Sequence, residues 1–196
     1  MKRTTKRLIF GTGVASLAAI VLTTACSNRS IDLVSEGKDA LRRTEDEARD
    51  AMARHSDEID ESLERFRKLF DEFRPGTVSD HARALYAPSA YFNDGFVELT
   101  DSEEIASYFD RSAEHTAEID IIVEEMTRTV DGIYVRWIMS FTTTGGTSIT
   151  APGISHLRFN TEGQIIYHRD YWDAGSALAE LVPVTGAVLR AIKARL

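Results

Sequence analysis

The sequence predicts an α+β domain in which helices cover one face of a curved antiparallel sheet. Two observations lead to this fold class. Three segments before residue 115 repeat apolar residues at helical spacing, whereas the chain after residue 118 carries runs of β-branched and aromatic residues that short glycine-containing turns separate. A chain of 196 residues is long enough for one domain with a substantial core but short for two.

Residues 1–25 have the three parts of a secretion signal. Four basic side chains precede an uncharged run that begins at Leu8, and small residues end the segment. Cys26, the only cysteine, follows directly. The stretch LTTAC at residues 22–26 resembles the lipobox at which bacterial lipoproteins are cleaved and acylated, although Thr23 stands where lipoboxes favour leucine. We therefore predict a signal peptide and lipidation of Cys26.

These features predict an exported protein of the cell envelope, lipid-anchored to a bacterial membrane and facing the periplasm or the cell exterior. Two alternatives stay open: a chance cysteine behind an ordinary signal, or an uncleaved anchor, because residues 8–25 are just long enough to span a bilayer. Loss of the four basic side chains changes the formal charge from −8 to −12. Such an acidic body lacks the clustered cations that nucleic acid requires, and an anionic leaflet repels it. We expect membrane contact through the N-terminal lipid anchor only.

Residues 26–58 are expected to form a tether and a charged helical stalk. Apolar residues recur at steps of seven, four and three from Val34 to Phe73, with charged side chains between them. A continuous helix over residues 32–73 would be roughly 60 Å long, more than one small domain can cover, so its first half should project as a stalk. A homodimer stays open, but the low apolar content before Ile59 argues against a coiled coil.

Residues 59–196 are expected to form the globular domain. Asp101 or Ser102 should begin a helix, because the two glutamates that follow favour the positive end of the helix dipole. The short turns between the later strands predict antiparallel neighbours. The expected elements are helices at 59–73, 79–86 and from about 102, a short strand and turn at 90–95, strands at 119–129, 132–143, 148–160 and 164–172, and a last helix at 187–195.

From about residue 63 to residue 191 the chain resembles the nuclear transport factor 2-like (NTF2-like) superfamily, close to its SnoaL-like and ketosteroid isomerase-like branch. The resemblance lies in LYAP (85–88), YFND (91–94), the expected helix with Ile105, Tyr108 and Phe109 on its apolar face, and above all HLRFNTEGQIIYHRDYWD (156–173). It implies a cone formed by a bent sheet wrapped around N-terminal helices and open at one end to a deep pocket. It implies less about function, because the same cone hosts isomerases, polyketide cyclases, epoxide hydrolases and modules without known chemistry.

The isomerase branch implies a general base just after the first strand, where this chain has Asp94. It also implies an aspartic acid directly before the strand that begins at His156, and a tyrosine on the first helix. This chain has Ser155 in the former place and phenylalanines on the helix. The isomerase machinery is therefore incomplete, since a developing enolate would lack its two strong donors.

The cyclase branch implies an acid–base aspartate on the last strand, which Asp170 or Asp173 could supply. Strand alternation places His168, Asp170 and Trp172 on one face. If the domain is an enzyme, its candidate catalytic residues are Asp94, His168 and Asp170, because a carboxylate in an apolar cone gains proton affinity. The favoured interpretation is structural: His168 and Asp170 pair with neighbouring strand residues, since no activated nucleophile accompanies them.

Four aromatic residues are candidates for ligand binding: Tyr91, Trp137, His156 and Trp172. Trp137 first of all fits the buried face of a strand, and a pocket wall is its second interpretation. No cofactor is expected, and no metal, because the histidines are scattered without ligand spacing. The leading interpretation is an envelope module that binds a small apolar molecule or an envelope protein without catalysis. The alternative is a small-molecule enzyme of cyclase, isomerase or hydrolase type with acid–base carboxylates.

Mass spectrometry of the protein purified from its own envelope tests the lipid anchor. We expect a mature chain that begins at Cys26 and carries the additional mass of acyl chains, because a lone cysteine at the cleavage point is the residue that a lipobox modifies. A Cys26→Ser variant should lack this mass and should no longer fractionate with membranes. An unmodified wild-type polypeptide would contradict the lipoprotein prediction.

Overall fold

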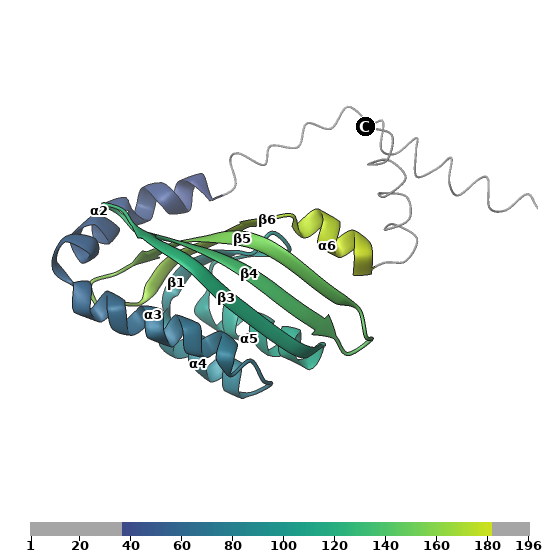
Figure 1. The fold of residues 1–196 in the computed structure, drawn as a ribbon. Coiled ribbons are helices and arrows are strands. Elements are labelled where there is room, and N and C mark those ends of the chain that lie inside the picture. Colours follow the sequence, from purple (N-terminus) through teal and green to yellow (C-terminus); the bar gives the residue numbers. More distant parts are fainter. Residues whose placement is uncertain (1–36, 182–196) are drawn as a thin grey trace, which may run out of the picture. The chain divides into compact units, whose positions relative to one another are not determined.

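The computed structural model describes residues 37–181 (Figure 1). The predicted signal peptide, the lipidation of Cys26 and the predicted last helix at 187–195 lie outside the described residues. No helix in the described range is long and apolar enough to cross a membrane. The elements in chain order are α2 (Lys38–Arg54), α3 (Ser56–Asp71), α4 (Thr77–Leu85), β1 (Tyr86–Asn93), β2 (Glu98–Leu99), α5 (Ser102–Glu114), β3 (Thr116–Arg128), β4 (Ile133–Thr143), β5 (Ser148–Phe159), β6 (Ile165–Trp172) and α6 (Ala174–Leu181).

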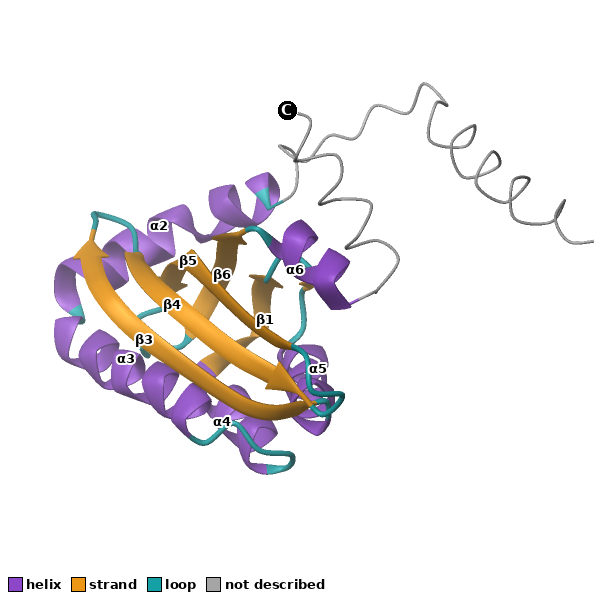
Figure 2. Ribbon diagram, turned by 45° about the vertical axis from the view of Figure 1, so that its right-hand side comes forward, coloured by secondary structure: helices purple, strands orange, loops and turns teal. Residues whose placement is uncertain are grey.

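Six strands form one curved sheet in the order β2-β1-β6-β5-β4-β3 (Figure 2). Strands β3 to β6 are antiparallel neighbours, as the short turns between them predict. Strand β1 pairs in parallel with β6, so the sheet is mixed and not purely antiparallel. The predicted α+β class and the sheet curved around N-terminal helices are confirmed.

Helices α3, α4 and α5 cover the concave side of the sheet and close the main core (Figures 1 and 2). Helix α5 begins at the predicted cap, where the side chain of Asp101 accepts hydrogen bonds from the two following glutamate amides. Helix α3 packs against the β5–β6 turn, where Ser62 Oγ donates to the carbonyl of Gly163. Gly163 has φ 75°, and a Cβ atom there would lie 2.6 Å from Glu58 O, so only glycine permits this contact.

Residues 38–54 differ from the expected stalk. The helix is interrupted at His55, and α2 lies against β5 and β6 on the outer face of the sheet. Ala40, Ala48 and Ala51 are buried there or in the adjoining core. Alanine adds little to an apolar periodicity, yet its small side chain lets a helix approach a sheet closely, which is why the pattern of larger residues did not reveal this contact.

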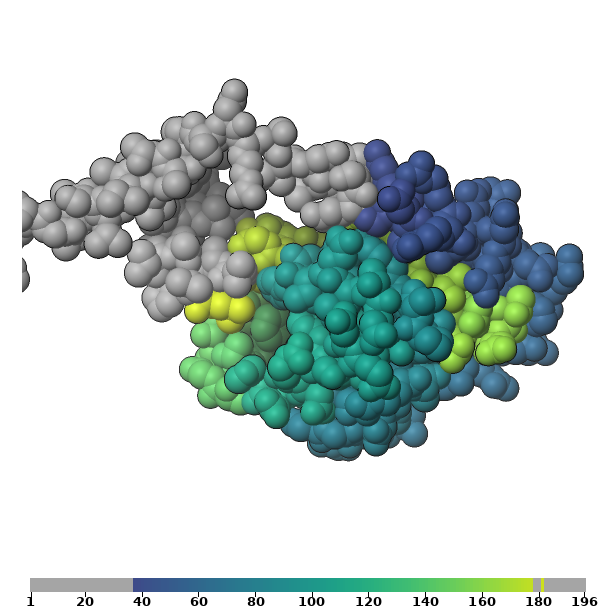
Figure 3. All heavy atoms as spheres, turned by 180° about the vertical axis from the view of Figure 1, so that it is seen from behind, coloured from purple at the N-terminus to yellow at the C-terminus, as the bar shows by residue number. Residues whose placement is uncertain are grey.

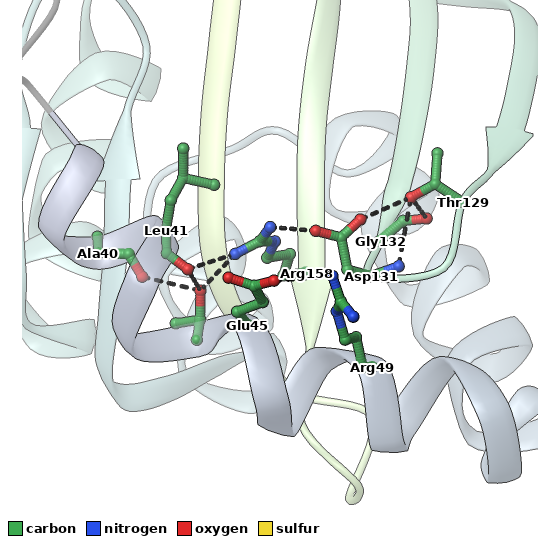
Figure 4. Close-up of polar contacts among 9 residues, drawn as sticks. Ala40, Leu41, Glu45, Arg49, Thr129, Asp131, Gly132 and Arg158 are labelled. Carbon is green, nitrogen blue, oxygen red and sulfur yellow. Dashed lines mark hydrogen bonds and ion pairs between the residues drawn. The ribbon is translucent and has the colours of Figure 1, made fainter.

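Arg158 fastens α2 to the sheet (Figure 4). Its side chain is only 7% exposed. Nη1 donates to Leu41 O at 2.5 Å and to Thr44 Oγ1 at 3.2 Å, and Nη2 forms an ion pair with Asp131. Burial alone would raise the pKa of Asp131, but the charge of Arg158 and the hydrogen bond from Thr129 outweigh burial and hold that pKa below its ordinary value. One buried cation thus joins a helix, a strand and a turn.

Removing this cation should weaken the attachment of α2. We expect Arg158→Ala to lower the free energy of unfolding by about 2–4 kcal/mol, because Asp131 would remain partly buried without its partner. Arg136→Ala is the matched control, since Arg136 pairs with Glu124 while about half-exposed and should contribute less than about 1 kcal/mol. Urea unfolding measures both values. Equal losses in the two variants would contradict a special role for Arg158, and hydrogen exchange should localise its effect to residues 38–54.

Candidate functional site

The concave side of the sheet and the facing helices enclose a cavity of about 480 Å³, a volume typical of small-molecule sites. Leu181 of α6 contributes to its wall. In Figure 3, α6 (yellow) and the β4–β5 hairpin (green) lie beside α5 (teal), and the surface is hollowed between them. Most of the lining is apolar and much of it aromatic: Phe66, Phe70, Phe73, Phe92, Phe96, Tyr108, Phe109, Trp137, Phe141 and Trp172.

Five of the residues singled out in the sequence line this one cavity: Asp94, Trp137, His168, Asp170 and Trp172. The last three share the inward face of β6, as the two-residue alternation of a strand predicts. Asp94 reaches the same space from the loop after β1. The structure therefore brings together all three candidate catalytic residues and both tryptophans.

Tyr91 and His156 do not line the cavity. Each belongs to the opposite face of the sheet, where Tyr91 stacks on Tyr167 at 5.1 Å and His156 stacks on Tyr134 at 4.4 Å between ring centroids. Alternation along β5 turns His156 outward because its neighbour Ser155 points inward. Burial, and next the charge of Arg158, lower the pKa of His156 to about 4. Neither side chain is therefore placed to contact a ligand inside the cavity.

A hydrogen-bond network joins strands β4, β5 and β6 at the cavity wall. Trp137 Nε1 donates to Ser155 Oγ at 2.9 Å, and Ser155 Oγ donates to Asp170 Oδ1 at 2.5 Å. The same Oδ1 lies 2.9 Å from Nε2 of His168, which is 1% exposed. Within the described residues, Oδ2 of Asp170 has no hydrogen-bond partner, so this oxygen remains able to accept a bond from a ligand.

The partner of His168 on its other side fixes the direction of these bonds. Tyr86 OH lies 2.6 Å from His168 Nδ1 and is fully buried. Burial, followed by the charges of Asp170 and Asp94, raises the pKa of Tyr86 well above its ordinary value, so the hydroxyl keeps its proton. It donates to Nδ1, which leaves Nε2–H to donate to Asp170. A neutral histidine ring satisfies all of these groups.

Asp94 occupies a second polar position in the cavity. Its Oδ1 accepts from the amides of Phe96 at 2.9 Å and Val97 at 3.0 Å, and its Oδ2 accepts from Tyr108 OH. Trp172 Nε1 donates to the main-chain oxygen of Asp94 at 2.6 Å. Burial raises the pKa of this carboxyl, and the hydrogen bond from Tyr108 acts in the opposite direction without cancelling the increase.

Three residues of the site were not recognised from their sequence pattern as partners of these groups: Tyr86, Tyr108 and Gly153. The spacing of Tyr108 fits the apolar face of its helix, yet a buried tyrosine needs a partner for its hydroxyl, and this need is the signal that could have indicated the contact with Asp94. Gly153 lies under the indole of Trp137, where an added Cβ would come within 2.2 Å of the ring. Among residues 37–181, no three His, Cys, Asp or Glu side chains are grouped so as to hold a metal ion.

Comparison with known proteins decides the family. Residues 66–168, just over half of the chain, match the model of the SnoaL-like domain. The chain belongs to the SnoaL-like domain family. No curated protein matches it. The family has the NTF2-like fold, in agreement with the resemblance seen in the sequence and with the curved sheet around α3 to α5.

Solved structures of other SnoaL-like and NTF2-like proteins show the same fold. An NTF2-like protein of unknown function from Exiguobacterium sp. 255-15 is 20% identical, with a TM-score of 0.51 over 57% of this chain and 98% of its own. A Jannaschia sp. CCS1 protein whose name proposes a SnoaL-like polyketide cyclase is 18% identical, with a TM-score of 0.52 over 61% and 90% of the two chains. An LEH-like epoxide hydrolase of M. tuberculosis is 12% identical, with a TM-score of 0.52 over 69% and 98%.

The hydrogen bond from Tyr108 can be tested by its effect on Asp94. We expect Tyr108→Phe to move the pKa of Asp94 further upward, because the lost donor stabilises the ionised carboxylate. Carboxyl-carbon NMR titration of both proteins measures this change. Tyr134→Phe on the outer face is the control and should leave the titration in place; an unchanged or lowered pKa in Tyr108→Phe would contradict the assignment.

The same raised pKa predicts a pH dependence of stability. The folded protein binds the Asp94 proton more tightly than the unfolded chain, so the contribution of this group to the free energy of unfolding should decrease as the pH rises from 3.8 through the raised pKa. Asp94→Asn should remove this decrease. Unfolding curves of the variant and the wild type across that range measure the difference.

Proposed function

We propose that this SnoaL-like protein is a module of the cell envelope that binds a small, largely apolar molecule inside its cone, and that binding and not catalysis is its function. The observation that carries the proposal is the aromatic cavity of about 480 Å³ with a few polar groups at one part of its wall. Apolar walls provide affinity, and a small number of placed polar groups orient a ligand. The envelope location is supported by the predicted signal and lipobox.

The polar groups support positioning more than reaction chemistry. Both oxygens of Asp94 already accept hydrogen bonds, from two main-chain amides and from Tyr108. The hydroxyl of Ser155 donates a hydrogen bond to Asp170 and accepts one from Trp137, so it is engaged on both sides as part of the cavity wall. Each group is held in place by its neighbours, which suits a preorganised binding site.

Acid–base catalysis is the second candidate function, and one observation favours it. Asp94 and Asp170 line the same cavity, and Oδ2 of Asp170 has no partner within the described residues. A carboxylate oxygen in that position could take a proton from a bound substrate. Under this candidate function, Asp170 would be the base and His168 would hold it in orientation.

The module could also bind a protein partner in the envelope, through a surface other than the cavity. The outer face of the sheet carries large apolar side chains that are exposed, among them Ile154 at 39% and Tyr171 at 48%. Exposed apolar side chains grouped on one face are a feature of surfaces that contact other proteins. This surface is separate from the cavity, so a partner there and a ligand inside the cone are compatible.

A matched pair of substitutions on β4 tests binding in the cavity. Met139 lines the cavity, whereas the neighbouring Ile138 does not. We expect Met139→Trp to fill the cavity and to weaken binding of the neutral fluorescent dye N-phenyl-1-naphthylamine by about tenfold, which corresponds to about 1.4 kcal/mol. Ile138→Trp should bind the dye as the wild type does. Fluorescence titration measures both.

Thermal unfolding of both variants checks that each is folded. Wild-type protein that does not bind the dye, or dye binding that Met139→Trp leaves unchanged, would refute an accessible apolar cavity. Turnover distinguishes the two candidate functions once a retained ligand has been identified by native mass spectrometry. Release of that molecule unchanged supports binding, whereas its conversion, lost in Asp170→Asn, supports catalysis.

A further inference from the structure

We propose that the cavity takes an organic cation, an ammonium group carried on an apolar body. This inference rests on the proposed function, since it names the class of ligand that the cone binds. Three features of the cavity wall support an organic cation. Its hydrogen-bond donors are engaged within the protein, its charged groups are mainly carboxylates, and aromatic rings lie beside these carboxylates.

The donors near the two carboxylates are engaged within the protein. Trp137 donates its indole N–H to Ser155, whose hydroxyl donates onward to the carboxylate of β6. Trp172 donates its N–H to the main-chain oxygen of Asp94, and Tyr108 donates to the carboxylate of the same residue. A carbonyl or a carboxylate of a ligand would therefore find no free indole or hydroxyl donor among these groups. This part of the wall offers acceptors.

Negative charge predominates in the same region. Asp94 accepts three hydrogen bonds, the pattern that an ionised carboxylate takes, and Asp170 accepts two on one oxygen. His168 is satisfied as a neutral ring between its two partners. Of the described residues that line the cavity, Arg67 is the one Lys or Arg, and its half-exposed side chain lies 3.6 Å from Glu64. The two carboxylates thus lack a buried cation.

Other lining donors lie at a different end of the cavity. Thr143 is the last residue of β4 and pairs in register with Thr116. The amide of Thr144 donates a hydrogen bond to the carbonyl of His115. Thr143 is six residues beyond Trp137 on an extended strand, which corresponds to about 20 Å. A ligand that places its charged group beside the tryptophans can direct its apolar body toward these residues and Phe141.

Aromatic rings lie beside the carboxylates. The rings of Trp137 and Trp172 are 6.4 Å apart between centroids, and Phe96 meets Trp172 edge to face at 5.3 Å. Indole is the strongest of the natural side chains in binding a cation over its face. Because both indole N–H groups are held by the protein, the rings are fixed while parts of them face the cavity.

A bound cation would also offset the cost of burying the two carboxylates in the ligand-free protein. Two carboxylates in an apolar cavity lose part of their hydration, and the upward shift in the pKa of Asp94, caused first by burial, reflects that loss. A neutral apolar ligand does not offset this cost, and an anion increases it further. An ammonium group reduces it, and one that carries hydrogens can also donate to Oδ2 of Asp170.

Two probes of the same shape test this inference on the full mature chain. Phenyltrimethylammonium and tert-butylbenzene differ by one positive charge at nearly constant volume, and each is measured by displacement of N-phenyl-1-naphthylamine. We expect the cation to bind about tenfold more tightly than its neutral isostere, a difference in line with cation–π attraction in a partly desolvated site. Asp170→Asn should reduce this preference to about threefold or less, because the side chain keeps its size and loses its charge.

Asp120→Asn is the matched control, because Asp120 is exposed on β3 and does not line the cavity. It removes the same charge from the sheet and should leave the tenfold preference intact. Equal displacement by the two probes would overturn the cation inference and leave the proposed apolar cavity standing. The inference also fails if both aspartate variants change the preference equally, since the effect would then be one of net charge. Absence of dye binding is a separate result and counts against the proposed function itself.

Discussion

The hydrogen bonds of the Asp170 carboxylate hold the polar side chains of the cavity wall in place. One of its oxygens accepts bonds from Ser155 on β5 and from His168 on its own strand, and Ser155 in turn holds the indole of Trp137 on β4. Three strands are therefore joined by side chains as well as by their main-chain ladders. Buried polar groups are stable only when their partners are present, so this arrangement fixes the positions of all of them together.

The alternation of β5 and β6 separates two environments that differ in chemistry. Inward residues such as Ser155 and Asp170 face aromatic walls, and outward residues such as Arg158 and Tyr167 lie against α2. A strand covered on both faces cannot shift by one residue, because every inward group would then turn outward. The helix on the outer face consequently supports the cavity on the inner face, although it does not touch it.

Much of the fold could be predicted from the sequence because the turns are local. Asp131-Gly132, Gly145-Gly146 and Glu162-Gly163 separate the four long strands, and Asp101 begins α5 as expected. That His168, Asp170 and Trp172 share one face follows from period two alone, whereas the structure shows that this face points into the cavity. The parallel pairing of β1 with β6 does not, because no short connection joins these strands.

Other parts of the site depend on contacts that no local pattern records. Alternation puts His156 on the face opposite Ser155, but which face of the sheet is the inner one depends on where the helices pack, and so does the outward position of Tyr91. The hydrogen bond between Tyr108 and Asp94 joins a helix to a loop, so the sequence around either residue does not predict the other as its partner. Lipidation of Cys26 and the envelope location stay predictions.

The position of Arg158 on β5 has a mechanical consequence. This strand holds α2 through Arg158 on one face and Asp170 through Ser155 on the other. Arg158 and Ser155 lie three residues apart on β5, so the attachment of α2 and the bond to Asp170 belong to the same short piece of backbone. A substitution that displaces this piece of β5 would therefore disturb the outer helix and the polar wall of the cavity together.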